Sequence, residues 1–72
     1  MTPTDQFIRG FERAMAIKCV TKAKVCRESG VSPMTLRRFM YKRTDIKLMT
    51  LARLCEDGLD MTFQTVFGMG GE

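Results

Sequence analysis

The strongest constraint on how this chain folds is a pair of closely spaced helix-start signals at Thr21 and Ser32. The hydroxyl of each residue can cap a helix by accepting a backbone N–H, and Pro33 suits the first helical position, where no N–H is needed. Gly30 lies between the two signals, where a left-handed residue commonly ends a helix. The pattern predicts two helices, over residues 22–29 and 33–41. Helices joined by so short a turn cross at a steep angle, so residues 21–41 are expected to form a helix-turn-helix unit.

A third helix is predicted ahead of this unit, over residues 3–18. Thr2 can cap it, and Asp5 stands three residues later, as in a capping box. Its apolar side chains recur at helical spacing and predict one core-facing stripe, made of Phe7, Ile8, Phe11, Ala14 and Met15. Gly10 lies within the helix and weakens it by about 1 kcal/mol relative to Ala.

Two further helices are predicted after the unit. The first covers residues 46–57, begins at a cap supplied by Thr44 or Asp45, and ends at Gly58. We expect its buried side to consist of Leu48, Leu51, Ala52 and Cys55, with Ile46 and Leu54 flanking.

The last predicted helix, over residues 63–67, is capped by Thr62, and residues 68–72 are expected to be a frayed tail. No segment alternates between apolar and polar residues as a strand would. A chain of 72 residues is long enough for one small domain. We therefore expect a single all-α domain of five short helices over residues 1–72.

The basic charge concentrates on the second helix of the unit and just after it. The net charge is +4, and the residues after Arg53 contribute only acidic groups. The cations of the central stretch are Arg37, Arg38, Lys42, Arg43 and Lys47. The helix over 33–41 contains no acidic residue. This asymmetry favours a face turned toward a polyanion, although a solvated surface explains the charge alone equally well.

Composition and motifs argue against several classes of protein. The chain has no His, and its three cysteines, Cys19, Cys26 and Cys55, form no CxxC pair, so we predict no metal site and no cofactor. Without a nucleophile–base pair or a glycine-rich phosphate loop, we predict no enzymatic activity and no small-molecule substrate. No apolar run approaches the roughly 18 residues of a membrane helix, and the N-terminus lacks a signal-peptide pattern. We expect a cytoplasmic protein with reduced thiols.

Several short motifs follow one another in a characteristic order within residues 5–67. They are Thr21-Lys22, Val25-Cys26, Gly30-Val31-Ser32, Thr35-Leu36, and a later series of Leu51, Leu54, Leu59-Asp60-Met61-Thr62 and Val66-Phe67. In this order they resemble the Cro/CI-type helix-turn-helix domains of phage repressors and their bacterial relatives. The chain departs from that family at two places. Lys22 stands where the family usually has Gln, and Met40-Tyr41-Lys42 replaces a Glu-x-Gly motif that the family often has shortly after the second helix of the unit. The spacing from Leu54 to Leu59 is also one residue longer than is typical.

The resemblance implies a lambda-repressor-like fold and a DNA-binding transcription regulator whose helix 33–41 enters the major groove. Carried over position by position, Pro33, Met34 and Arg38 occupy the places from which such proteins usually read bases. Arg37 sits beside them and completes the predicted base-contacting set. The phosphate-contacting residues are Thr21, Lys22, Ser32, Thr35, Lys42, Arg43 and Lys47. Arg38 is the best candidate for specificity because its planar guanidinium can pair with O6 and N7 of guanine. Family members usually bind as homodimers, and Phe67 and Met69 are candidate dimer contacts.

A second hypothesis keeps the fold but changes the partner. The chain would be a phage-type modulator or antirepressor that binds another repressor protein through helix 33–41. Seven methionines are many for so short a chain, and Met side chains adapt to irregular partner surfaces. Met34 and Tyr41 are placed on the outward side of this helix by its periodicity. Acidic side chains of a partner would then take the place of phosphates opposite Arg37 and Arg38.

Overall fold

The computed structural model describes residues 2–42 and 46–71, and every regular element in these ranges is helical. In chain order the elements are α1 (Pro3–Lys18), α2 (Lys22–Ser29), α3 (Pro33–Lys42), α4 (Leu48–Arg53), the π-helical turn η1 (Leu54–Gly58) and α5 (Phe63–Gly70). The predicted all-α class is confirmed for this part of the chain. None of the described helices is long and apolar enough to cross a membrane.

Four helices begin at the hydroxyl residues that predicted them, which are Thr2, Thr21, Ser32 and Thr62. Each hydroxyl accepts a hydrogen bond of 3.1–3.2 Å from a backbone N–H in the first turn of its helix. Gly30 ends α2 with a φ of 75°, as expected for a left-handed cap. The predicted bounds of α1 and α2 are confirmed, and α3 runs one residue further than predicted, to Lys42.

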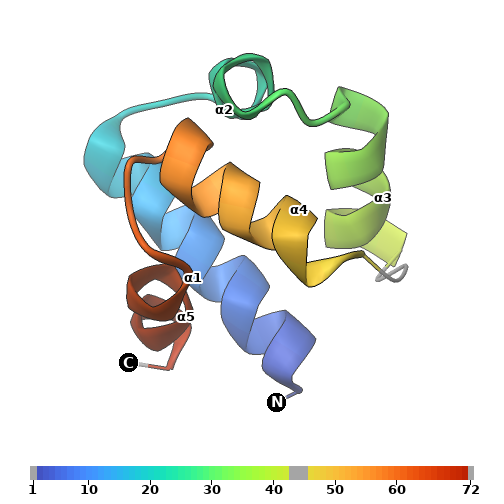
Figure 1. Ribbon diagram of the computed structural model, residues 1–72. Helices are drawn as coiled ribbons and strands as arrows, with labels where there is room; N and C mark the ends of the chain where they lie inside the picture. Colours follow the sequence, from blue (N-terminus) through green and yellow to red (C-terminus); the bar gives the residue numbers. More distant parts are fainter. Residues whose placement is uncertain (1, 43–45, 72) are drawn as a thin grey trace.

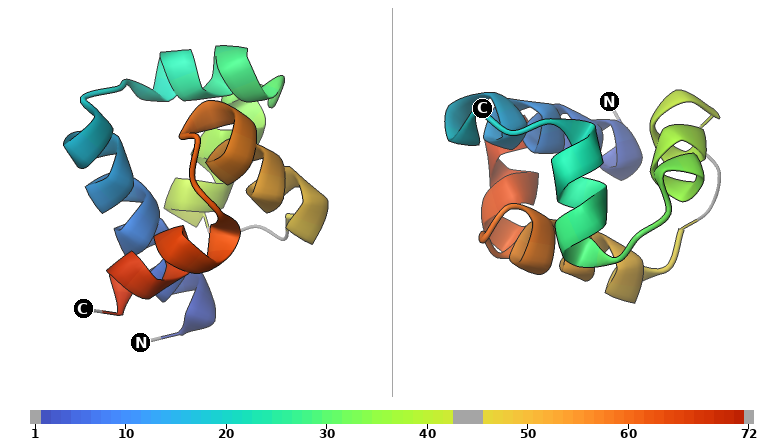
Figure 2. Two further views of the ribbon diagram at one scale, coloured as in Figure 1. Left: turned by 60° about the vertical axis from the view of Figure 1, so that its left-hand side comes forward. Right: turned by 90° about the horizontal axis from the view of Figure 1, so that it is seen from above.

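The helices enclose one core, in which Phe7 of α1 holds a central place. Its ring lies 5.9 Å from that of Phe11, 5.3 Å from that of Phe63 and 6.0 Å from that of Phe39, measured between centroids. The whole predicted apolar stripe of α1 is buried. Since Phe39 places one side of α3 against α1, the other side of α3 is left facing outward. Figure 2 shows α3 leaving the end of α2 and lying at the edge of the molecule.

Helices α1 and α5 touch backbone to backbone at two glycines. A Cβ atom added at Gly10 would lie 1.8 Å from the carbonyl oxygen of Val66, and one added at Gly70 would lie 1.7 Å from that of Gln6. The Gln6 side chain also donates a hydrogen bond of 3.0 Å to the carbonyl of Phe67. Because this contact holds the end of α5, the expectation of a frayed tail over residues 68–72 is wrong for residues 68–71.

The helix predicted over residues 46–57 differs from the structure at both ends. Its α-helical part begins at Leu48, with Lys47 at the N-cap in an extended conformation, and the predicted caps Thr44 and Asp45 lie outside the described residues. From Leu54 the chain forms the π-helical turn η1, which takes up one more residue per turn than an α-helix. This turn spans the five-residue step from Leu54 to Leu59, both of which are buried.

The buried side of the segment predicted as one helix over residues 46–57 therefore differs from the expected one, because its fully buried residues lie in η1 and none lies in α4. Leu54, expected on the flank, is fully buried together with Cys55. Leu48, expected in the core, is 67% exposed because the first turn of α4 projects past the core. Leu51 and Ala52 are half-buried.

Candidate nucleic-acid interface

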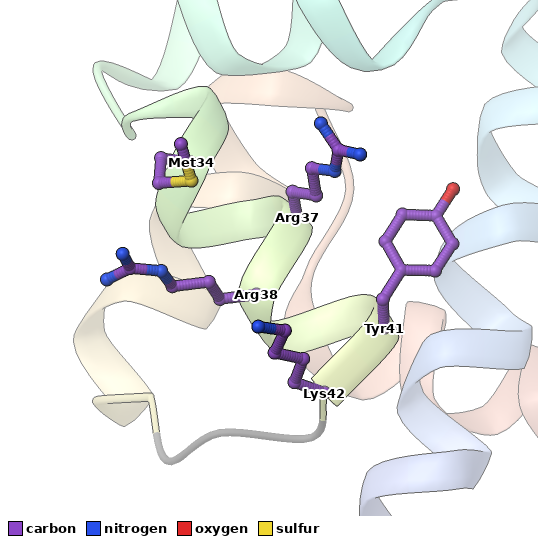
Figure 3. A pocket seen from close by; sticks show the side chains of 5 residues that line it. All are labelled: Met34, Arg37, Arg38, Tyr41 and Lys42. Carbon is purple, nitrogen blue, oxygen red and sulfur yellow. The ribbon is translucent and has the colours of Figure 1, made fainter.

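Helix α3 has one apolar side in the core and one basic side facing outward. Leu36, Phe39 and Met40 are buried, as their spacing predicts. The residues that alternate with them are exposed and line a surface hollow of about 460 Å³, here called the outer hollow: Met34, Arg37, Arg38, Tyr41 and Lys42. Figure 3 shows these five side chains projecting from one side of α3. Among the described residues, the outer hollow therefore combines three cations with two large side chains and no carboxylate.

A second depression lies beside the outer hollow, between α2 and α3. This α2–α3 groove has a volume of about 340 Å³ and is lined by Lys22, Ala23, Cys26, Pro33, Leu36, Arg37 and Tyr41. Buried Leu36 and Cys26 form its apolar floor, whereas Lys22 and Arg37 supply positive charge. Arg37 and Tyr41 belong to both depressions, so the basic surface continues from α3 to the start of α2.

Lys22 and Tyr41 join the two helices across this groove. The Lys22 ammonium donates a hydrogen bond of 3.1 Å to the Tyr41 hydroxyl and lies 4.9 Å from the centre of the ring. Both side chains are exposed, and Tyr41 is 68% accessible to solvent. This pairing was not predicted from the sequence. The signal for it is the helical spacing of Arg37 and Tyr41, which places both on the side of α3 that faces the start of α2.

The four residues predicted to contact bases do not all lie together. Met34, Arg37 and Arg38 share the outer hollow, and Pro33 lines the α2–α3 groove instead. Arg37 and Arg38 have no hydrogen-bond or ion-pair partner among residues 2–42 and 46–71. Within this part of the chain, nothing competes with a ligand for their guanidinium groups.

The residues predicted to contact phosphates fall into four groups. Thr21 and Ser32 already accept the capping hydrogen bonds of α2 and α3, which explains both hydroxyls without a ligand. Lys22 and Lys42 line the depressions described above, while Thr35 and Lys47 are exposed outside them. Arg43 lies outside the described residues.

The candidate dimer contacts Phe67 and Met69 lie on α5, away from this surface. Both are half-buried and pack against the core. The Phe67 ring stacks on Phe63 with a centroid distance of 5.8 Å. The backbone carbonyl of Met69 accepts a hydrogen bond of 2.6 Å from Arg13 of α1. Much of the surface of these two residues is thus used within the chain.

The cysteines and acidic residues that the structure describes form no second site. Burial raises the pKa of the Cys26 thiol, and burial together with the nearby Glu56 charge raises the pKa of Cys55 to about 12. Cys19 is exposed and ends α1 in a left-handed conformation with a φ of 56°. No group of three or more His, Cys, Asp or Glu side chains in the described ranges is arranged to hold a metal ion.

Comparison of the chain with protein-family models, with curated proteins and with solved structures finds no match. The interpretation of the basic surface therefore depends on its own geometry and charge.

Proposed function

We propose that this chain is a small, sequence-specific DNA-binding transcription regulator of the Cro/CI helix-turn-helix type. In this proposal α2 and α3 are the helix-turn-helix pair, and α3 is the recognition helix in the major groove. The observation that carries it is the outward side of α3, which is basic, free of carboxylates and held away from the core. A major groove about 12 Å wide admits such a helix, and its phosphates attract the surrounding cations.

The arrangement of α2 supports the same proposal. Its capped N-terminus brings free backbone N–H groups and Lys22 next to the α3 surface. Backbone N–H groups at helix N-termini and Lys side chains commonly bind DNA phosphates and fix the register of a recognition helix. A domain of this size reads only a short half-site, so we propose that it acts as a homodimer on an operator, in the cytoplasm of a bacterium.

A second candidate function is binding of another repressor protein through the same side of α3. It is favoured by the exposure of Met34, which is 55%, and of Tyr41, because large exposed side chains beside arginines are common in protein interfaces. We rank it second because the basic surface continues from α3 to α2. Such a surface suits a partner with many negative charges in a row, such as DNA, better than it suits a small patch on another protein.

Titration of a fluorescent duplex with the protein at several salt concentrations tests the proposal. If about five cations meet phosphates, the logarithm of the binding constant should fall against the logarithm of salt with a slope of about −4 to −5. Lys18→Gln is the matched control, because Lys18 lies on the end of α1 opposite to α3 (Figure 1) and should leave the slope unchanged. If no duplex binds at about 50 mM salt and 10 μM protein, DNA binding is wrong and the repressor-binding alternative gains support.

A further inference from the structure

Arg37 and Arg38 are neighbours in the sequence, yet they face different surroundings. Figure 3 shows the Arg37 side chain extending toward α2 and the Arg38 side chain, on the same outward side of α3, extending away from α2. Arg37 lines both the outer hollow and the α2–α3 groove, whereas Arg38 lines the outer hollow and does not reach the groove. This difference matters because a recognition helix places only part of its outward surface against base edges.

On the groove side, three hydrogen-bond donors surround one depression. They are the Lys22 ammonium, the Arg37 guanidinium and the Tyr41 hydroxyl. Because the Tyr41 oxygen accepts the hydrogen bond from Lys22, its own O–H is directed elsewhere and can donate. No carboxylate of the described residues lines the groove. Two positive charges and a neutral donor suit an oxyanion such as a backbone phosphodiester.

Away from the groove, Arg38 lies in the outer hollow, one helical turn after Met34 and one turn before Lys42. An extended guanidinium beside an exposed thioether can pair with a guanine edge while the methionine contacts a neighbouring thymine methyl. No hydrogen bond within residues 2–42 and 46–71 holds Arg38 in another direction.

We propose that the two arginines have different roles in binding DNA. This assignment rests on the proposed DNA-binding function. Arg38 reads a base in the major groove, whereas Arg37, with Lys22 and Tyr41, holds a backbone phosphate at the α2–α3 groove. This assignment moves Arg37 out of the base-contacting set predicted from the sequence, in which it stood because it adjoins Arg38. Sequence preference of the protein then depends on Arg38, and general affinity depends on Arg37.

The variants Arg37→Gln and Arg38→Gln test this division, because each removes one charge from an exposed helical position and keeps a good helix former. Circular dichroism of both variants checks that the fold is retained. The affinity of each is measured for the preferred duplex of the wild type and for a scrambled duplex, over a range of salt.

Arg37→Gln should weaken binding to both duplexes by the same factor and reduce the salt slope by about 0.9, leaving the ratio of the two affinities unchanged. Arg38→Gln should lower that ratio by about fivefold to a hundredfold. Tyr41→Phe should weaken binding to both duplexes equally without changing the slope, because it removes a donor but no charge.

The assignment would be overturned if Arg37→Gln changed the ratio of the affinities for the two duplexes, or if Arg38→Gln left that ratio unchanged. Either result would leave DNA binding established. Equal binding of both duplexes by the wild type would overturn the base-reading role of Arg38. Failure of the wild type to bind either duplex would overturn the proposed function itself, and the assignment with it.

Discussion

The ammonium of Lys22, the first residue of α2, donates a hydrogen bond of 3.1 Å to the hydroxyl of Tyr41, in the last turn of α3. This bond connects the two helices on their solvent side, opposite the buried contacts that join them to the core. It also brings one cation of α2 beside the basic outward side of α3. Both residues differ from the pattern of the Cro/CI-type family that the sequence resembles, and in the structure they are bonded to each other.

The bond between Lys22 and Tyr41 should contribute little to stability. Both groups are exposed, so water competes for the bond, and exposed polar pairs of this kind contribute about 0.2–1 kcal/mol. Urea unfolding of Lys22→Met, Tyr41→Phe and the double variant gives their coupling free energy. We expect a value in that range, whereas a coupling above about 2 kcal/mol would show that the pair holds α2 and α3 together.

The contact between Gly10 and Gly70 should be far more sensitive to substitution. Gly10→Ala and Gly70→Ala each place a Cβ atom within 1.8 Å of a backbone oxygen on the facing helix, so α1 and α5 must separate. We expect each to lower the free energy of unfolding by about 3 kcal/mol or more. Urea unfolding followed by circular dichroism measures this loss.

Gly68→Ala is the matched control for these two variants. It lies on the same helix, but an added Cβ would meet nothing within 4 Å. Alanine favours the helix over glycine, so stability should rise by about 0.5–1 kcal/mol. Equal losses at Gly68 and Gly70 would contradict the close approach of α1 and α5.

The buried thiols should make the protein sensitive to alkaline pH. The pKa of Cys55 is raised to about 12, and that of Cys26 is raised as well, both from a value of 9.0. Between the unfolded and folded pKa values, only the unfolded state loses the proton, so stability is constant below about pH 8 and falls as the pH rises above 9. Urea unfolding between pH 7 and pH 10 measures this fall, which Cys55→Ala should reduce.

The three cysteines should also differ in their reaction with a thiol reagent. Cys19 is exposed, whereas Cys26 and Cys55 are buried. In the native protein at pH 8 we expect one thiol to react rapidly and two to react only at the rate of unfolding. Mass spectrometry of the modified peptides identifies the sites. Rapid labelling of Cys55 would contradict the core described for α4 and η1.

Local signals in the sequence predicted the helix starts well. Thr2, Thr21, Ser32 and Thr62 each supply a cap whose effect depends only on the next few residues. The apolar stripe of α1 was equally clear, because a long helix repeats its pattern over several turns. For the same reason the basic outward side of α3 could be read from the spacing of its residues.

What could not be predicted depends on contacts between distant parts of the chain. Gly70 was predicted to belong to a frayed tail, because the backbone near Gln6 that it contacts lies far away in the sequence. Leu48 was predicted to be buried because it shares the helical spacing of Leu51 and Cys55. In the structure the first turn of α4 lies outside the core, and Leu48 is exposed. The pairing of Lys22 with Tyr41 likewise could not be predicted, because it depends on the angle at which α2 and α3 cross.

Selection from a random duplex library at about 150 mM salt tests the central claim most directly, because nonspecific phosphate binding is weakened there. The account predicts enrichment of a two-fold symmetric site with half-sites about one helical turn apart, and loss of that enrichment with Arg38→Ala. If the wild type enriches no sequence, or if Arg38→Ala enriches the same site as strongly, α3 is not a recognition helix that reads DNA through Arg38.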